Sequence, residues 1–278
     1  MNYLMKNKLY FILLVLSQNL ICQQILEDHP LSKTIEETSG LEIIDNMLIT
    51  HNDSGGEPAL YYIDKKGKIV ETRKIKGVKN NDWEDITKDD EFIYIANMGN
   101  NFDTRKNLSI IKIPIKKSSD ETVELINFLY PEQKKFNTIY SKSQYDGEGI
   151  VSIKDDLIIF TKNKLKKITE LYSLPKTSGN FEAKKISSID VKSIVTGSDY
   201  NNQLKLLALT STVDFKKYFL ILIKDFSLEN KEHEIETYEI PIGKTQVEAV
   251  KIINKNTFWI SSEDESSSKH ARLLKLKI

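Results

Sequence analysis

The sequence has one cysteine, no apolar run of membrane-spanning length and no excess of either charge, and each absence excludes a class of protein. The single cysteine, Cys22, lies in the N-terminal segment, so the rest of the chain forms no disulfide within itself. Residues 23–278 are numerous enough to bury a core without such crosslinks. A transmembrane helix needs about 20 apolar residues, so we expect no transmembrane segment in the mature chain.

The charges also exclude a nucleic-acid partner. Forty basic residues balance forty acidic ones, and removal of Lys6 and Lys8 leaves 38 against 40. No basic stripe is interleaved with aromatic residues, as nucleic-acid binding would require. Lysine-rich stretches such as residues 162–167 are typical of turns and strand edges, where we expect them to be solvated.

The N-terminal segment has the pattern of a secretory signal. Lys6 and Lys8 precede an apolar run at residues 9–16, which is too short for a membrane span but suits a signal peptide. We therefore predict that residues 1–22 are a signal peptide and that the protein is exported to the periplasm or the exterior. Alternatively, Cys22 could be lipid-modified and anchor the chain, although the two residues before it are bulky.

A repeat runs through the rest of the chain. Three copies place a glutamate at the start of an apolar segment, and thirteen residues later comes a small polar residue. The pairs are Glu84 with Asn97, Glu148 with Thr161, and Glu248 with Ser261. Weaker copies pair Ser39 with Asn52 and Gly197 with Thr210. Internal repeats decide the architecture before single residues do.

Short strands fill the intervals, and no helical period of useful length appears. The last unit has only three strands, while residues 24–35 belong to no complete unit. A ring of four-stranded sheets explains both facts, because the N-terminal segment then supplies the missing outer strand and hides sheet edges. We predict one all-β domain, residues 23–278: a β-propeller of five four-stranded blades whose ring is closed by this strand. A sixth blade could lie between Glu84 and Glu148.

Propeller symmetry places the repeated polar positions around one mouth of the central channel. Clustered carboxylates repel one another unless they are protonated or bridged by a cation. Oxygen ligands without histidine or cysteine favour calcium. The predicted metal ligands are Glu84, Glu148, Glu248, Asn52 and Asn97; the other predicted binding residues are Asp53, Asp82, Asp146, Asn100, Asn101, Thr161, Thr210 and Ser261. Alternatively, these positions cap strands and are architectural.

Two segments, 51–58 and 97–105, depart from the repeat and extend over the mouth. They supply the two candidate catalytic residues. His51 could act as a general base, or it could be a hydrogen-bonded loop residue. Arg105 could bind an anionic substrate in a bidentate manner, or it could form a salt bridge with Asp103 or Asp85. We expect Trp83 to pack between blades.

These motifs carry a resemblance that covers most of the mature chain. The series 39–41, 51–55, 82–86, 99–101 and Arg105 resembles a group of secreted bacterial β-propellers. The motif at residues 146–150 is similar to that of the esterase-like phytase and SdiA-regulated propellers of the calcium-dependent propeller superfamily. The resemblance implies five or six blades and a channel calcium. The chain departs from the phytase pattern because no complete set of phosphate-binding basic residues matches.

Two functions fit this pattern. The first is an exported module that binds a small molecule, a glycan or a protein at the channel mouth. The alternative is a calcium-dependent hydrolase of an ester, lactone or phosphoester, in which calcium polarises the substrate. We favour the binding module, because no nucleophile and base can be paired from their spacing.

Overall fold

A computed structural model describes residues 23–118, 122–230, 232–243, 245–263 and 270–278. The predicted signal peptide, with Cys22, lies outside these ranges. Within them, no helix is long and apolar enough to cross a membrane.

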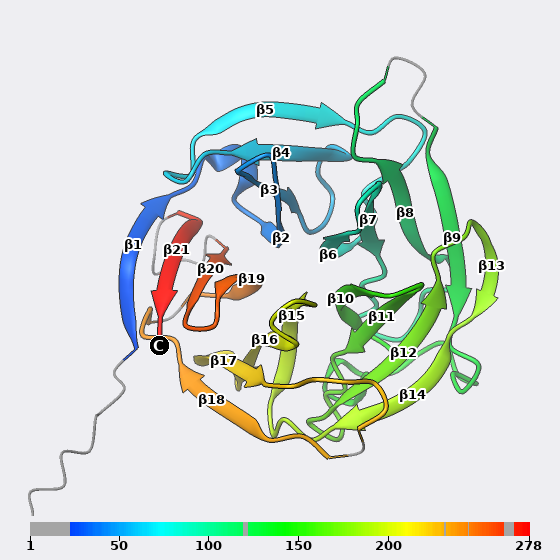
Figure 1. Ribbon diagram of the computed structural model, residues 1–278. Helices are drawn as coiled ribbons and strands as arrows, with labels where there is room; N and C mark the ends of the chain where they lie inside the picture. Colours follow the sequence, from blue (N-terminus) through cyan, green and yellow to red (C-terminus); the bar gives the residue numbers. More distant parts are fainter. Residues whose placement is uncertain (1–22, 119–121, 231, 244, 264–269) are drawn as a thin grey trace, which may run out of the picture.

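The described chain folds into a five-bladed β-propeller (Figure 1). Blade 1 contains β2 (Thr38–Ile44), β3 (Met47–Asn52), β4 (Ala59–Ile63) and β5 (Ile69–Lys74). Blade 2 contains β6 (Trp83–Lys88), β7 (Phe92–Asn97), β8 (Leu108–Pro114) and β9 (Glu124–Leu129). Blade 3 contains β10 (Gly147–Ile153), β11 (Asp156–Thr161), β12 (Thr169–Pro175) and β14 (Lys184–Ile189). Blade 4 contains β15 (Ile194–Asn201), β16 (Leu206–Val213), β17 (Lys217–Ile223) and β18 (Ile235–Glu239).

Blade 5 combines the two ends of the described chain. It contains β19 (Val247–Asn254), β20 (Thr257–Ser262) and β21 (Arg272–Lys277), and β1 (Gln24–Pro30) pairs antiparallel with β21. The N-terminal segment therefore supplies the outer strand of the last blade, as the strand count predicts. A short strand, β13 (Gly179–Glu182), adds to β9 in parallel at the outer edge of blade 2.

The long interval between Glu84 and Glu148 holds the four strands of blade 2 and no further sheet among the residues described. Its extra length forms the connection from β9 to β10, which contains the 3-10 helix η2 (Tyr140–Lys142). A second 3-10 helix, η1 (Lys33–Ile35), follows β1.

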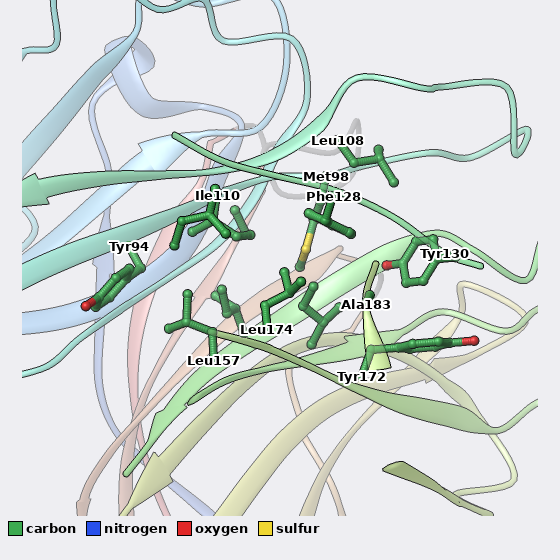
Figure 2. Close-up of a cluster of buried hydrophobic side chains, with 14 residues drawn as sticks. Tyr94, Met98, Leu108, Ile110, Phe128, Tyr130, Leu157, Tyr172, Leu174 and Ala183 are labelled. Carbon is green, nitrogen blue, oxygen red and sulfur yellow. The ribbon is translucent and has the colours of Figure 1, made fainter. Parts of the chain in front are cut away.

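Hydrophobic side chains fill the spaces between neighbouring blades. In the cluster of Figure 2, Tyr94, Ile110 and Phe128 of blade 2 face Leu157 and Leu174 of blade 3, and all are buried. Another cluster joins blades 1 and 2 around the fully buried Trp83 ring, so this residue packs between blades as predicted. Each fully buried leucine, isoleucine or phenylalanine side chain in these clusters contributes about 1.5–3 kcal/mol to folding.

The inner strands β2, β6, β10, β15 and β19 surround the channel and contact one another in sequence around it. They approach too closely for side chains at some positions. A Cβ atom added to Gly197 would lie 2.3 Å from the carbonyl oxygen of Glu248, and one on Gly149 would lie 2.6 Å from Ser198 Oγ. Small residues are therefore required where the inner strands meet.

Candidate functional site

One backbone hydrogen bond recurs at the same end of four blades and fixes which residues are equivalent. The N–H groups of Asp53, Gly99, Lys162 and Glu263 donate to the carbonyl oxygens of Glu37, Asp82, Asp146 and Gln246, at 2.9, 3.2, 2.6 and 2.8 Å. We call the donor residues the partner positions. The glutamate positions lie two residues after each acceptor: Ser39, Glu84, Glu148 and Glu248. In blade 4 the register places Thr196 and Thr212 at these two positions.

The glutamate positions coincide with irregularities in the strand pairing. The register of the first strand shifts between Trp83 and Ile86, between Gly147 and Gly149, and between Val247 and Ala249. A bulge of this kind re-aims a side chain and is common near functional sites. Here it turns the repeated glutamates toward the channel mouth, where all three line one cavity.

That cavity has a volume of about 320 Å³. Its lining includes five residues predicted to bind ligand or metal, namely Asp53, Glu84, Asn101, Glu148 and Glu248. The remaining lining residues are Ser39, Tyr140, Lys162, Phe215 and Gln246. A larger hollow of about 420 Å³ between blades 3 and 4 has only Asp225 and Glu229 as carboxylates, beside Lys154 and Lys205.

Carboxylate oxygens of blades 1, 2 and 3 meet beside this cavity. Asp53, Asp82 and Glu84 form one group whose oxygens lie within 4.8 Å of one another, and Glu84, Asp146 and Glu148 form another. Glu84 belongs to both. Glu84 is only 6% exposed, and no described residue donates a hydrogen bond to its carboxylate or forms an ion pair with it.

The missing side chain of Gly99 makes this arrangement feasible. A Cβ atom at that position would lie 1.8 Å from Glu84 Oε1 and 2.5 Å from the Asp82 carboxylate. Both acidic groups therefore occupy the space that a partner-position side chain would fill.

The blade 3 carboxylates have basic partners instead. Lys162 Nζ lies 2.6 Å from Glu148 Oε1, and Lys164 Nζ lies 2.9 Å from Asp146 Oδ2 and 2.6 Å from Asn101 Oδ1. Burial alone would lower the pKa of Lys162, but Glu148 and Asp146 raise it well above its usual range. The prediction that these lysines are solvated was wrong, because buried carboxylates need a counter-charge.

Burial makes the carboxyl groups at the mouth hold protons readily, and it raises the pKa of Glu148 well above its usual range although Lys162 opposes the shift. Burial, together with the neighbouring Asp82, raises the pKa of Asp53 to about 8. Burial and the charges of Glu148 and Asp53 raise the pKa of Glu84 well above its usual range. A cation bound between these groups would take the place of those protons.

Arg105 holds the loop that carries Gly99 and is not part of the cavity lining. Its guanidinium donates to the carbonyl oxygens of Gly99 and Asn97 at 2.6 and 3.2 Å, and it lies 3.8 Å from Asp82. The amide of Asn97 in turn donates to Ser109 Oγ at 3.1 Å. Arg105 thus forms its ion pair with Asp82.

The two aspartates expected to bind Arg105 have other partners. Asp103 accepts from Ser143 Oγ at 2.7 Å, and Asp85 accepts from the N–H of Ile150 at 2.9 Å. Asn100 also positions the loop, because its N–H donates to Asp146 Oδ1 at 2.6 Å.

His51 is fully buried beneath the mouth and does not line the cavity. Its Nδ1 bonds to the carbonyl oxygen of Asn52 at 3.1 Å, and its ring meets Trp83 edge-on at 5.6 Å. Burial lowers the pKa of His51 to about 4. The Asn52 amide donates to Thr34 O at 2.9 Å, so both residues brace the loop after β3.

The small polar residues of the thirteen-residue spacing lie between strands, away from the cavity. Thr161, Thr210 and Ser261 are fully buried. Thr161 pairs with Gly147, whereas Thr210 pairs with Gly197 and Ser261 with Ala249. Thr210 and Ser261 are therefore shifted by one residue from the strand position that Thr161 occupies. A shift of one residue turns a side chain to the other face of the sheet.

Sequence reasoning did not identify Lys162, Lys164, Tyr140 or Phe215 as site residues. For Lys162 a signal exists: it comes directly after the second strand of its unit, as Asp53 does in blade 1. The two aromatic residues come from loops outside the repeat.

Comparison with known proteins supports the fold. No known family matches the sequence, and no curated protein matches it. The PQQ-bound aldose sugar dehydrogenase of Streptomyces coelicolor is similar in structure, with a TM-score of 0.54 and 11% identity over 92% of this chain and 97% of that one. A glucose dehydrogenase matches with a TM-score of 0.50 and 9% identity over 90% and 99%. At such identities the likeness shows a shared propeller fold.

Proposed function

We propose that this protein is a ligand-binding propeller whose channel mouth holds a calcium ion between Asp53, Asp82 and Glu84. The observation that carries the proposal is the Glu84 carboxylate, which is buried beside a cavity and has no basic partner among the described residues. A buried carboxylate without a counter-charge is costly. A cation at this point would remove that cost.

The donor set suits a hard divalent cation. All of the converging groups are carboxylates, and the one nearby imidazole, His51, does not line the cavity. Calcium prefers several oxygen ligands in flexible geometry, whereas zinc and copper select nitrogen or sulfur. Amide and hydroxyl oxygens at the mouth, such as that of Ser39, could complete the shell.

The charge balance leads to the same conclusion. Six carboxylates (Asp53, Asp82, Glu84, Asp146, Glu148 and Glu248) meet three basic groups (Arg105, Lys162 and Lys164), which leaves −3 when all are ionised. One calcium ion reduces this to −1. Part of the negative charge is thus still available to a ligand.

A binding role fits the site better than hydrolysis. The hydrolase alternative assigned the base to His51 or a spare carboxylate and the anion contact to Arg105, and neither His51 nor Arg105 lines the cavity. Predicted export supports weak calcium binding, since extracellular modules work with Kd values of about 10⁻⁴–10⁻³ M. The resemblance to the calcium-dependent propeller superfamily is consistent with this role, although the particular subgroup stays a prediction.

Thermal unfolding of residues 23–278 in calcium and in chelator tests the proposal. Calcium at a hundred times its Kd stabilises the folded state by about 2.7 kcal/mol, which raises Tm by roughly 5–10 °C for a chain of this size. Glu84→Gln should abolish the increase. Glu248→Gln is the matched control, because Glu248 is 5% exposed and occupies the same repeat position; it should retain most of the increase. An identical Tm for the wild type in both conditions would refute the proposal.

A further inference from the structure

Two aromatic rings cover the cavity from different blades. Tyr140 comes from η2, between blades 2 and 3, and Phe215 comes from the β16–β17 hairpin of blade 4. Their ring centroids lie 6.2 Å apart with planes at 41°. Lys164 Nζ lies over the Tyr140 ring, 3.8 Å from its centroid, and Tyr140 remains 39% exposed, so part of its surface is open to a ligand.

The hairpin holds Phe215 in an unfavourable backbone conformation. Asp214 and Phe215 have φ values of +57° and +52°. Asp45 and Asn46 also adopt this region and tolerate it, and Lys154 and Lys205 occupy it in other hairpin turns, but Phe215 is the one aromatic residue with such a φ among those described. A bulky residue there is an outlier, and such strain is typically retained at binding sites. The strained turn places the Phe215 ring in the lining of the cavity.

The charges of the cavity restrict the chemistry of its ligand. With calcium bound, a residual charge of −1 disfavours an anion. The ammonium group of Lys162, which also lines the cavity, disfavours an organic cation. A neutral ligand with many hydroxyl groups is favoured, because hydroxyls donate to carboxylates and accept from both an ammonium group and a metal ion.

We propose that the ligand is a small neutral saccharide. Its C–H face would lie on Phe215 and Tyr140, because ring faces are negative and attract the weakly positive C–H groups. Its hydroxyls would contact Lys162, Glu248 and the cation held by Glu84. A cavity of about 320 Å³ is at the lower end of the range for small-molecule sites, so the ligand has one or two sugar rings. This inference rests on the proposed function, since the cation completes the hydroxyl-binding surface.

Saturation-transfer NMR with residues 23–278 in saturating calcium tests the proposal. The neutral probes are glucose, galactose, mannose, N-acetylglucosamine, maltose, cellobiose and lactose. The charged comparators are inorganic phosphate, glucose 6-phosphate and choline. We expect at least one neutral sugar to bind. Phe215→Leu should weaken it about tenfold, as loss of an aromatic contact does, while Phe136→Leu, an exposed ring outside the lining, should not.

Calcium titration of the same variants separates the two proposals. Phe215→Leu should bind calcium as the wild type does. If the wild type binds calcium but none of the neutral sugars, the saccharide inference fails and the cation site stands. Preferential binding of phosphate, glucose 6-phosphate or choline would also overturn the inference. If calcium does not bind, the proposed function fails.

Discussion

Blades 2 and 3 place a glutamate at the same position of the repeat, and the two carboxylates have opposite surroundings. Glu148 faces Lys162 at the partner position, at 2.6 Å. Glu84 faces Gly99, whose missing side chain leaves room for Asp82 as well. One blade therefore neutralises its own buried charge and the other does not. This difference is the reason that we place the proposed cation beside Glu84 and not beside Glu148.

A second group of inner-strand carboxylates is neutralised by a buried lysine, as Glu148 is. Lys251 Nζ lies 2.6 Å from Glu42 Oε1 and 2.8 Å from Asp199 Oδ1. The N–H of Ile252 also donates to Asp199 Oδ2 at 2.7 Å. Glu84 of blade 2 and Glu248 of blade 5 depart from this pattern: both are buried, line the cavity and form no ion pair among the described residues. Of the two, Glu84 is the one whose carboxylate converges with two others.

Substitution of Lys162, the lysine that pairs with Glu148 in blade 3, should have the largest effect on the difference between blades 2 and 3. Lys162→Met leaves Glu148 buried without a counter-charge, which costs about 3–5 kcal/mol. In chelator we expect Tm to fall by roughly 6–20 °C, and calcium should recover part of the loss by bridging the bared carboxylates. Calorimetry in both conditions measures this. The exposed pair of Lys217 and Glu239 provides the control, and Lys217→Met should change Tm little. If calcium stabilises Lys162→Met no more than the wild type, the electrostatic explanation is wrong.

The reverse change gives blade 2 the partner residue of blade 3. In Gly99→Lys the new Cβ would lie 1.8 Å from Glu84 Oε1, so the Glu84 side chain has to move. The added ammonium group can then pair with the Glu84 carboxylate. The calcium-dependent increase in stability, about 2.7 kcal/mol at a hundred times Kd, should disappear. Gly99→Ala introduces the same clash without the charge, so it should lose calcium binding and also be less stable than Gly99→Lys. Calcium titration and chemical unfolding of both variants measure this, and retained calcium binding in Gly99→Lys would contradict the account.

The pH dependence of calcium binding tests the role of Asp53 in the proposed site beside Glu84. Asp53 has a pKa of about 8 without the ion, and calcium binds the deprotonated form. Protonation of Asp53 should therefore lower the affinity as pH decreases below 8, by up to about tenfold per pH unit. Burial raises the pKa of Glu148 as well, although Lys162 opposes the shift. Titration calorimetry in buffers of different ionisation enthalpy would count the protons released. Equal affinity at pH 6.5 and 8.5 would exclude this role for Asp53.

A further prediction, which concerns stability and not calcium binding, involves His51. Its folded pKa of about 4 lies below the unfolded value of about 6.5, so the unfolded state binds more protons between these values. Stability should fall as pH decreases from 6.5 toward 4. In His51→Gln this part of the pH dependence should be absent, which urea unfolding over that range can measure. The affinity for calcium at pH 8 should not change, because His51 lies outside the cavity.

Much of the fold could be predicted from the sequence, since the strand pattern and the repeated glutamates are local features. The equivalence of partner positions could not. Asp53, Gly99 and Lys162 lie 14, 15 and 14 residues after the glutamate positions of their blades, and bulges absorb the difference. A fixed spacing of thirteen therefore selected residues on both faces of the sheet. Burial of Lys162 was also hidden, because a lysine-rich stretch is most often solvated.

The most direct test is a crystal structure of residues 23–278 grown in calcium, with the ion located by its anomalous scattering. The account predicts one ion with Glu84 and carboxylates of Asp53 or Asp82 at about 2.3–2.6 Å, and an intact ion pair between Lys162 and Glu148. An empty Glu84 site at saturating calcium, or an ion that displaces Lys162 from Glu148, would contradict it.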